Sequence, residues 1–125
     1  MEQDNGKKVL VVEDDTNQRE LYVDELESEG YQVLTAATGR DALNVARENA
    51  PDIIVLDINM PGMDGLDTLS HLLEVNRRTP VIINTAYASY QDSFTSWSAD
   101  AYVVKSSDLG ELKATIKKLL DKNHD

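Results

Sequence analysis

Apolar and polar residues follow two different rhythms along this chain. Four short apolar runs, rich in β-branched residues, are too short for ordinary helices and favour strands that are buried on both faces. A fifth segment alternates at every second residue, as a weaker strand does. The five predicted strands cover 8–12, 31–35, 53–56, 81–83 and 101–104.

Between the strands, apolar residues recur every three or four positions, which predicts amphipathic helices. The first helix begins at Thr16 as its N-cap, carries Leu21, Tyr22 and Leu26 as an apolar stripe, and stops near Gly30. The other helices are expected over 39–49, around the leucines at 66, 69 and 73, over 87–98, and from 109 to 122. The pattern over 87–98 is the weakest because serines dilute it.

Strands and helices in strict alternation, five of each, predict an α/β fold. Its sheet should be parallel, with right-handed crossovers and helices on both faces. A length of 125 residues fits one domain. We expect this domain over 7–122, with a flexible N-terminal tail at 1–6, a C-terminal tail at 123–125 and no output domain.

Composition narrows the class of protein. The absence of cysteine excludes disulfides, thiolate catalysis and zinc–thiolate sites. No apolar run approaches the roughly 20 residues that span a bilayer, and the N-terminus lacks the apolar core of a secretory signal. We therefore expect a cytoplasmic protein without a membrane partner. A formal net charge of −11 argues against direct DNA binding and suits a cation site, although solubility explains most of it.

The chemistry is expected at the ends of the strands. Ligands of open α/β sheets bind at the carboxyl ends of the strands, and the run 53–56 ends on Asp57 before a loop that contains proline and glycine. Polar residues also follow the first, fourth and fifth strands, namely Glu13, Asp14 and Asp15, then Thr85, then Lys105. If these strands are neighbours, the polar residues converge in one shallow pocket.

Crowded carboxylates need a cation or a raised pKa. At about 4 Å they repel by about 4 kcal/mol per pair when the effective dielectric constant is about 20. Mg²⁺ accepts one or two protein carboxylates while it keeps waters and a phosphate oxygen. Asp14 and Asp57 are the predicted direct ligands. Glu13 is a direct or water-mediated ligand, and the backbone carbonyl of Asn59 is a further one.

With Mg²⁺ in place, a phosphoryl reaction becomes chemically reasonable. Lys105 and the Thr85 hydroxyl would donate to phosphoryl oxygens, and Asp57 would attack phosphorus to give an aspartyl phosphate. Each residue alone has an ordinary explanation: a strand-end aspartate is more often a cap or turn residue, and an isolated lysine is a solvated surface residue. Their occurrence together favours the chemical interpretation.

Four motifs, each at a predicted strand end, resemble those of receiver domains of two-component response regulators. They are VLVVEDD with Glu13 and Asp14, IIVLDINMPGMDG with Asp57, Asn84-Thr85-Ala86, and AYVVK with Tyr102 and Lys105. The likeness runs from Lys8 to Leu120 and implies a CheY-like, doubly wound sheet with strand order 2-1-3-4-5 and five helices.

The resemblance implies a stand-alone response regulator with Asp57 as phosphoacceptor. The phosphoryl group would come from a sensor histidine kinase, a histidine phosphotransfer protein or a small phosphodonor, with Mg²⁺ or Mn²⁺ as cofactor. Thr85 and Lys105 would contact it, and Thr85 and Tyr102 would shift together as the switch. Such a protein is not an enzyme beyond its own phosphorylation and dephosphorylation. It would signal to an effector through the face of the fourth helix, fifth strand and fifth helix, or onward in a phosphorelay.

Some positions depart from the family pattern. The family usually has a cis proline after the lysine, whereas Ser106 follows Lys105 here. A cis bond before a residue other than proline costs about 2.5–4 kcal/mol, so we expect a trans bond.

In the fourth helix, a partner-binding stripe is one interpretation of three aromatic residues, but we expect at least two to pack on the sheet. They are Tyr90, Phe94 and Trp97.

Two positions are candidates for control of dephosphorylation. Asn59 and Tyr87 each lie two residues after a site residue, where the resemblance implies a rate-tuning role. Tyr87 is bulky enough to shield an acyl phosphate from water. We therefore predict slow self-dephosphorylation, and faster loss of phosphate in a Tyr87→Ala variant.

Three other functions fit parts of the pattern. A magnesium-dependent phosphohydrolase with an aspartate nucleophile would want a second acid where this chain has Asn59. A flavodoxin-like FMN carrier needs a hydroxyl- and glycine-rich loop after the first strand, where three acidic residues would repel phosphate. A pseudo-receiver that works without phosphorylation would not need the complete set of acidic, hydroxyl and lysine residues.

Overall fold

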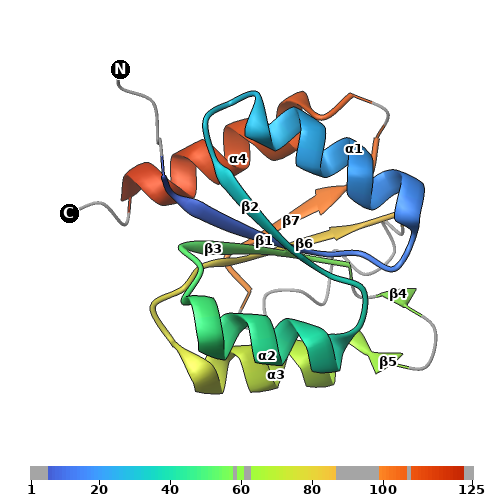
Figure 1. Ribbon diagram of the computed structural model, residues 1–125, viewed down its shortest axis with the longest axis vertical. Coiled ribbons are helices and arrows are strands. Elements are labelled where there is room, and N and C mark those ends of the chain that lie inside the picture. The colour runs from blue at the N-terminus through green and yellow to red at the C-terminus, as the bar shows by residue number, and fades with distance from the viewer. Residues whose placement is uncertain (1–5, 58, 61–62, 87–98, 107, 123–125) are drawn as a thin grey trace.

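The computed structural model describes residues 6–57, 59–60, 63–86, 99–106 and 108–122. Its centre is a parallel five-stranded sheet in the order β2-β1-β3-β6-β7 (Figure 1). The strands are β1 (Lys8–Val12), β2 (Gln32–Ala36), β3 (Ile53–Leu56), β6 (Val81–Thr85) and β7 (Ala101–Val104). When these five strands are numbered along the chain, their order is 2-1-3-4-5, so the predicted α/β fold is confirmed.

Helices cover both faces of the sheet (Figure 1). One face carries α1 (Thr16–Glu27) and α4 (Gly110–Lys122), and the other carries α2 (Gly39–Asn49) and α3 (Gly65–Val75). The remaining predicted helix, 87–98, lies outside the described residues, together with its aromatic residues and Tyr87. No helix in the described ranges is both long enough and apolar enough to cross a membrane.

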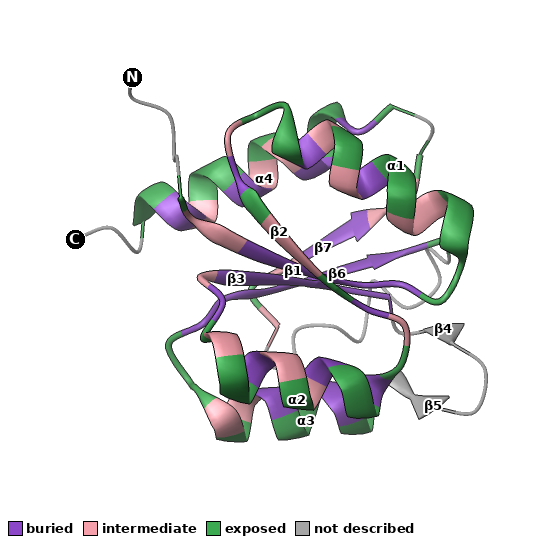
Figure 2. Ribbon diagram, in the orientation of Figure 1, coloured by how far each residue is buried: buried purple, intermediate pink, exposed green. Residues whose placement is uncertain are grey.

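The sheet separates two apolar cores because successive side chains of a strand point to opposite faces. The core under α1 and α4 includes Val9, Val11, Ile53, Val55 and Ile82. The core under α2 and α3 includes Leu10, Val12, Ile54, Leu56 and Ile83. In Figure 2 the central strands are buried over most of their length, whereas the edge strand β2 has exposed positions. The sheet is therefore a rigid support for whatever stands at its carboxyl edge.

Two expectations about α1 were wrong. Asp15, not Thr16, is the N-cap: its side chain accepts a hydrogen bond from the Gln18 N–H at 3.0 Å, and Thr16 is the first helical residue. Leu21 is 44% exposed and does not belong to the buried stripe of the helix. The stripe consists of Tyr22 and Leu26, which are one turn apart, and Leu21 is rotated by about 100° from Tyr22.

A short antiparallel pair after β3 was not predicted. Strand β4 (Asn59–Met60) pairs with β5 (Met63–Asp64) in a segment that we expected to be a loop. Two-residue strands are too short to show an alternating pattern in the sequence. The pair directly follows the strand that ends at Asp57, so it belongs to the surroundings of the site.

The fourth and fifth strands of the sheet end side by side. β6 continues two residues beyond the predicted end, to Thr85, which lies in register with Val104 of β7. The backbone N–H of Lys105 then donates to the Thr85 carbonyl at 2.7 Å. No cis peptide bond occurs in the part of the chain that the structure describes, so the Lys105–Ser106 bond is trans, as expected.

Candidate functional site

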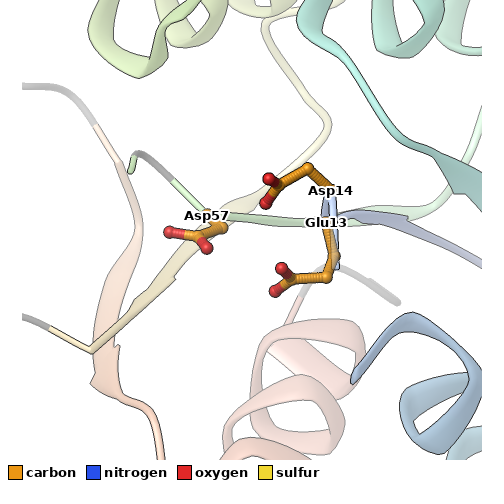
Figure 3. A group of neighbouring side chains, drawn as sticks. All are labelled: Glu13, Asp14 and Asp57. Carbon is orange, nitrogen blue, oxygen red and sulfur yellow. The ribbon is translucent and has the colours of Figure 1, made fainter. Parts of the chain in front are cut away.

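Three acidic side chains meet at the carboxyl edge of the sheet. Glu13 and Asp14 follow β1, Asp57 follows β3, and Figure 3 shows the three carboxylates close together. One carboxylate oxygen of each lies within 4.8 Å of the corresponding oxygens of the other two. Glu13 and Asp57 are 2% and 5% exposed, whereas Asp14 is exposed. The fold thus brings together the acidic groups that the sequence placed at separate strand ends.

Lys105 lies between two of these carboxylates. Its Nζ atom donates to Glu13 Oε1 at 2.6 Å and to Asp57 Oδ2 at 2.9 Å. The backbone N–H of Asp15 donates to the other oxygen of Glu13, Oε2, at 3.1 Å. Both carboxylate oxygens of Glu13 therefore have partners within the protein.

Burial dominates the electrostatics of Glu13. Loss of solvent raises the pKa of its carboxyl group, and the hydrogen bonds from Lys105 and Asp15 offset this only in part. For Lys105, burial by itself lowers the pKa of the ammonium group. The hydrogen bonds to Glu13 and Asp57, with their negative charge, outweigh burial and leave that pKa raised. Lys105 is therefore held in its cationic form next to Asp57.

Thr85 presents a buried hydroxyl with no hydrogen-bond partner among the described residues. The residue is 0% exposed at the end of β6. Nearly all buried polar groups in proteins are hydrogen-bonded, so a hydroxyl without a partner suggests a ligand atom that is not part of the chain.

The remaining predicted site residues have mixed outcomes. Tyr102 lies in register with Ile83 and belongs to the core under α2 and α3, where it is 8% exposed. Thr85 is two residues beyond Ile83 on the same strand, so the side chains of Thr85 and Tyr102 point to the same face of the sheet. Asn59 begins β4 and pairs with Asp64. The predicted role of Tyr87 lies outside the described residues.

Sequence reasoning missed two contacts next to the site. The Arg19 Nη1 atom donates to the carbonyls of Glu13 and Asp14, at 2.8 and 3.4 Å.

In the second contact, Asn84 Nδ2 donates to the Tyr22 hydroxyl at 3.1 Å, which links β6 to α1 inside the core. Burial raises the pKa of the Tyr22 hydroxyl, and the hydrogen bond from Asn84 opposes that shift. A polar residue directly before Thr85, in an otherwise apolar strand, was the available signal for the second contact.

The donor set fits a hard divalent cation. Mg²⁺ prefers carboxylate and carbonyl oxygens and uses few protein ligands. The site contains three carboxylates with converging oxygens and one ammonium group, so acidic groups outnumber basic groups there. Thr85 ends β6 and Lys105 directly follows β7, its neighbour in the sheet, so both side chains are available as donors to a bound oxyanion. The arrangement can therefore hold a cation and a phosphoryl group together.

Comparison with known proteins shows which family this chain belongs to. Residues 9–117 match the family model for the response regulator receiver domain. Transcriptional regulatory protein PrrA of Mycobacterium tuberculosis is 41% identical over 115 residues, which cover 90% of this chain but only 49% of PrrA. The chain thus spans about half the length of that relative. Sporulation initiation phosphotransferase F of Bacillus subtilis is 34% identical over 118 residues, which cover 92% of this chain and 94% of that protein.

Solved structures agree in fold. The response regulator TrrA of Thermotoga maritima, in complex with Mg²⁺-BeF, matches with a TM-score of 0.85 and 42% identity, covering 90% of this chain and 98% of that chain. A chain in the complex of histidine kinase ThkA with TrrA matches with a TM-score of 0.83 and 43% identity, covering 91% of this chain and 98% of its own length.

Proposed function

Because the chain belongs to the response regulator receiver domain family, we propose that Asp57 accepts a phosphoryl group from a sensor histidine kinase or a histidine phosphotransfer protein. The observation that carries the proposal is the set of groups around Asp57. Its buried carboxylate belongs to the acidic cluster and accepts a hydrogen bond from the Lys105 ammonium at 2.9 Å. The neighbouring strand β6 ends at Thr85, whose hydroxyl has no hydrogen-bond partner in the described residues.

The reaction is a transfer between two nucleophiles. A carboxylate oxygen of Asp57 attacks the phosphorus of a phosphohistidine, an O–P bond forms, and the N–P bond breaks with its electron pair returning to the imidazole nitrogen. The Lys105 ammonium and the Thr85 hydroxyl donate to the equatorial phosphoryl oxygens as negative charge develops there. Bound Mg²⁺ would neutralise part of that charge.

Glu13, Asp14 and Asp57 would hold the cation. The contacts of Glu13 give it a different role from the other two, because Lys105 and the Asp15 N–H already occupy its two oxygens. Glu13 therefore suits a water-mediated contact and also orients Lys105. The Asn59 carbonyl is a further proposed ligand, and Mn²⁺ would be accepted in place of Mg²⁺ because the same oxygen ligands suit both ions.

We propose that phosphorylation signals by changing the surface that a partner protein binds. A phosphoryl group adds a charge of about −1.5 to −2 and three strong acceptor oxygens. Thr85 would move toward it, and the position of Tyr102 would shift in response, which changes the surface around β7 and α4. The change is a shift between existing states, read by an effector protein or by the next protein in a phosphorelay.

We further propose that this chain works as a stand-alone cytoplasmic regulator, without enzymatic activity on other substrates and without direct DNA contact. The near-complete match to sporulation phosphotransferase F, over 94% of its length, supports a single receiver unit. The half-length match to PrrA is the competing observation, because it fits a receiver that is joined to another domain. The net charge of −11 supports protein partners over nucleic acid.

Intact-mass measurement after incubation with acetyl phosphate and Mg²⁺ tests the proposal. We expect one phosphoryl adduct on the chain and none on an Asp57→Asn variant. Chelation of Mg²⁺ should abolish the adduct, and Mn²⁺ should restore it. An adduct that persists in Asp57→Asn would contradict the assignment of the acceptor. Turnover of a phosphate ester in large excess over the protein would point to a phosphohydrolase instead.

A further inference from the structure

Arg19, the fourth residue of α1, reaches back to the loop that carries the acidic residues. Its Nη1 atom donates to the Glu13 carbonyl at 2.8 Å and to the Asp14 carbonyl at 3.4 Å. Its Nη2 atom lies 3.5 Å from Thr16 Oγ1, which steadies the guanidinium from the helix side. A planar guanidinium presents several donors in a fixed geometry, so one side chain can hold neighbouring carbonyls.

The Asp14 carboxylate depends on its backbone for its position. Asp14 is the exposed member of the acidic cluster, and within the described ranges its carboxylate makes no hydrogen bond of its own. The peptide group before Asp14 is held through the Glu13 carbonyl, and the one after it through the Asp14 carbonyl and the Asp15 N–H. Arg19 makes two of these three contacts.

The helix itself does not explain why a cation stands here. Positive charge near the N-terminus of a helix opposes the helix dipole, and the carboxylate of the N-cap Asp15 offsets only part of that effect. Arg19 is only half-buried, and its contacts are directed at the loop rather than at the core. The two carbonyl contacts are what this side chain contributes to the structure.

We propose that Arg19 is a positioning residue for the magnesium site, because its hydrogen bonds to the Glu13 and Asp14 carbonyls fix the position of the Asp14 carboxylate. The inference rests on the proposed function, since it assigns a role toward the cation that Glu13, Asp14 and Asp57 would hold. It adds a residue that touches neither the cation nor the phosphoryl group.

A role of Arg19 as a counter-charge and a role in positioning Asp14 predict opposite changes in Mg²⁺ affinity when Arg19 is replaced. A binding measurement therefore distinguishes the two roles. If Arg19 acted only as a counter-charge, its removal would make the site more negative and strengthen Mg²⁺ binding. If Arg19 positions Asp14, its removal loosens a ligand and weakens Mg²⁺ binding. Outer partners that orient metal ligands typically contribute about 10–100-fold in affinity.

The experiment is calorimetric titration of the full chain with Mg²⁺ alone, without a phosphodonor. We expect Arg19→Met to weaken Mg²⁺ binding by about tenfold. Arg19→Lys keeps the positive charge but loses the planar pair of donors, so we expect it also to bind Mg²⁺ more weakly than the wild type. Arg77→Met is the matched control, because Arg77 is an exposed arginine in the turn before β6, at the opposite edge of the sheet. Its affinity should equal that of the wild type.

The outcomes separate the two proposals. Unchanged or tighter Mg²⁺ binding by Arg19→Met, with normal binding by the wild type, overturns the positioning role and leaves the proposed function intact. Absence of Mg²⁺ binding by the wild type overturns both. Circular dichroism checks folding of each variant; if Arg19→Met does not fold, Arg19→Lys decides, and wild-type affinity in that variant overturns the proposal.

Discussion

At the scale of single residues, the site contains groups that cost the fold free energy. Glu13 and Asp57 are buried carboxylates that share the ammonium of Lys105, and Thr85 is buried without a partner for its hydroxyl in the described residues. A buried polar group without a hydrogen bond costs about 1–3 kcal/mol. Costs of this kind are expected where a site is arranged for a ligand rather than for stability.

Thr85→Val should therefore stabilise the unphosphorylated protein. Valine has nearly the same shape and removes the unpartnered hydroxyl, so we expect the free energy of unfolding to rise by about 1–3 kcal/mol in urea denaturation without Mg²⁺. Thr79→Val is the matched control, because the buried Thr79 hydroxyl donates to the Pro51 carbonyl at 3.5 Å. That variant should lose stability. Equal destabilisation by both substitutions would show that the Thr85 hydroxyl has a partner in the folded chain.

At the scale of elements, α1 connects the site to the core. Its N-cap Asp15 belongs to the acidic loop, its first turns carry Arg19, and its buried face presents Tyr22 to Asn84 of β6. Asn84 directly precedes Thr85, the proposed switch residue, so a side-chain hydrogen bond links the strand that carries Thr85 to α1. Substitutions along α1 are therefore expected to act on the site and on the core separately.

The N-cap assignment is tested by two neighbouring alanine substitutions. Asp15→Ala removes the acceptor for the Gln18 N–H and should cost about 0.5–2 kcal/mol of unfolding free energy. Thr16→Ala removes only the exposed 3.5 Å contact of Oγ1 with Arg19 Nη2, so it should change stability by less than about 0.5 kcal/mol. Chemical denaturation of both variants decides the matter, and the reverse order of effects would restore Thr16 as the cap.

The Tyr22–Asn84 pair has a testable energy and pH dependence. Tyr22→Phe leaves the Asn84 amide without its buried acceptor and should cost about 1–3 kcal/mol near pH 7. Because the folded-state pKa of Tyr22 is raised, the stability that the neutral phenol contributes is complete below the ordinary tyrosine pKa. It is lost as pH rises through the raised value. The difference between wild type and Tyr22→Phe should therefore shrink above about pH 10.

A double variant provides the control for this pair. Replacing both partners, as Tyr22→Phe with Asn84→Val, removes the orphaned amide and should recover part of the stability that Tyr22→Phe loses. Urea unfolding of the four proteins of this cycle gives the coupling energy. Additive losses from the two substitutions would mean that the hydrogen bond contributes nothing to the folded state.

At the scale of the whole molecule, hydrophobic periodicity was sufficient for the layers but not for every contact. The runs that became β1, β3 and β7 had the predicted bounds because each is a nearly continuous run of apolar residues in the sequence. The strand order came from the family resemblance, since periodicity does not say which strands are neighbours. The β4–β5 pair was too short to leave a pattern.

The same distinction holds for the site. The proximity of Glu13, Asp14, Asp57 and Lys105 was predictable because each follows the end of a strand, and the strand ends converge in a parallel sheet. Arg19 and the Tyr22–Asn84 pair were not, because their partners are backbone carbonyls or lie 62 positions away in sequence. Helical periodicity placed Leu21 in the core, yet the orientation of α1 leaves it 44% exposed.

The central claim is that Asp57 carries the phosphoryl group, and chemical trapping tests it most directly. Borohydride reduces an aspartyl phosphate to homoserine, which peptide mapping by mass spectrometry locates in the sequence. After treatment with acetyl phosphate and Mg²⁺, we predict homoserine at position 57 alone, and none when Mg²⁺ is chelated. Homoserine at another aspartate, or none in the presence of Mg²⁺, would contradict the assignment of the phosphoacceptor.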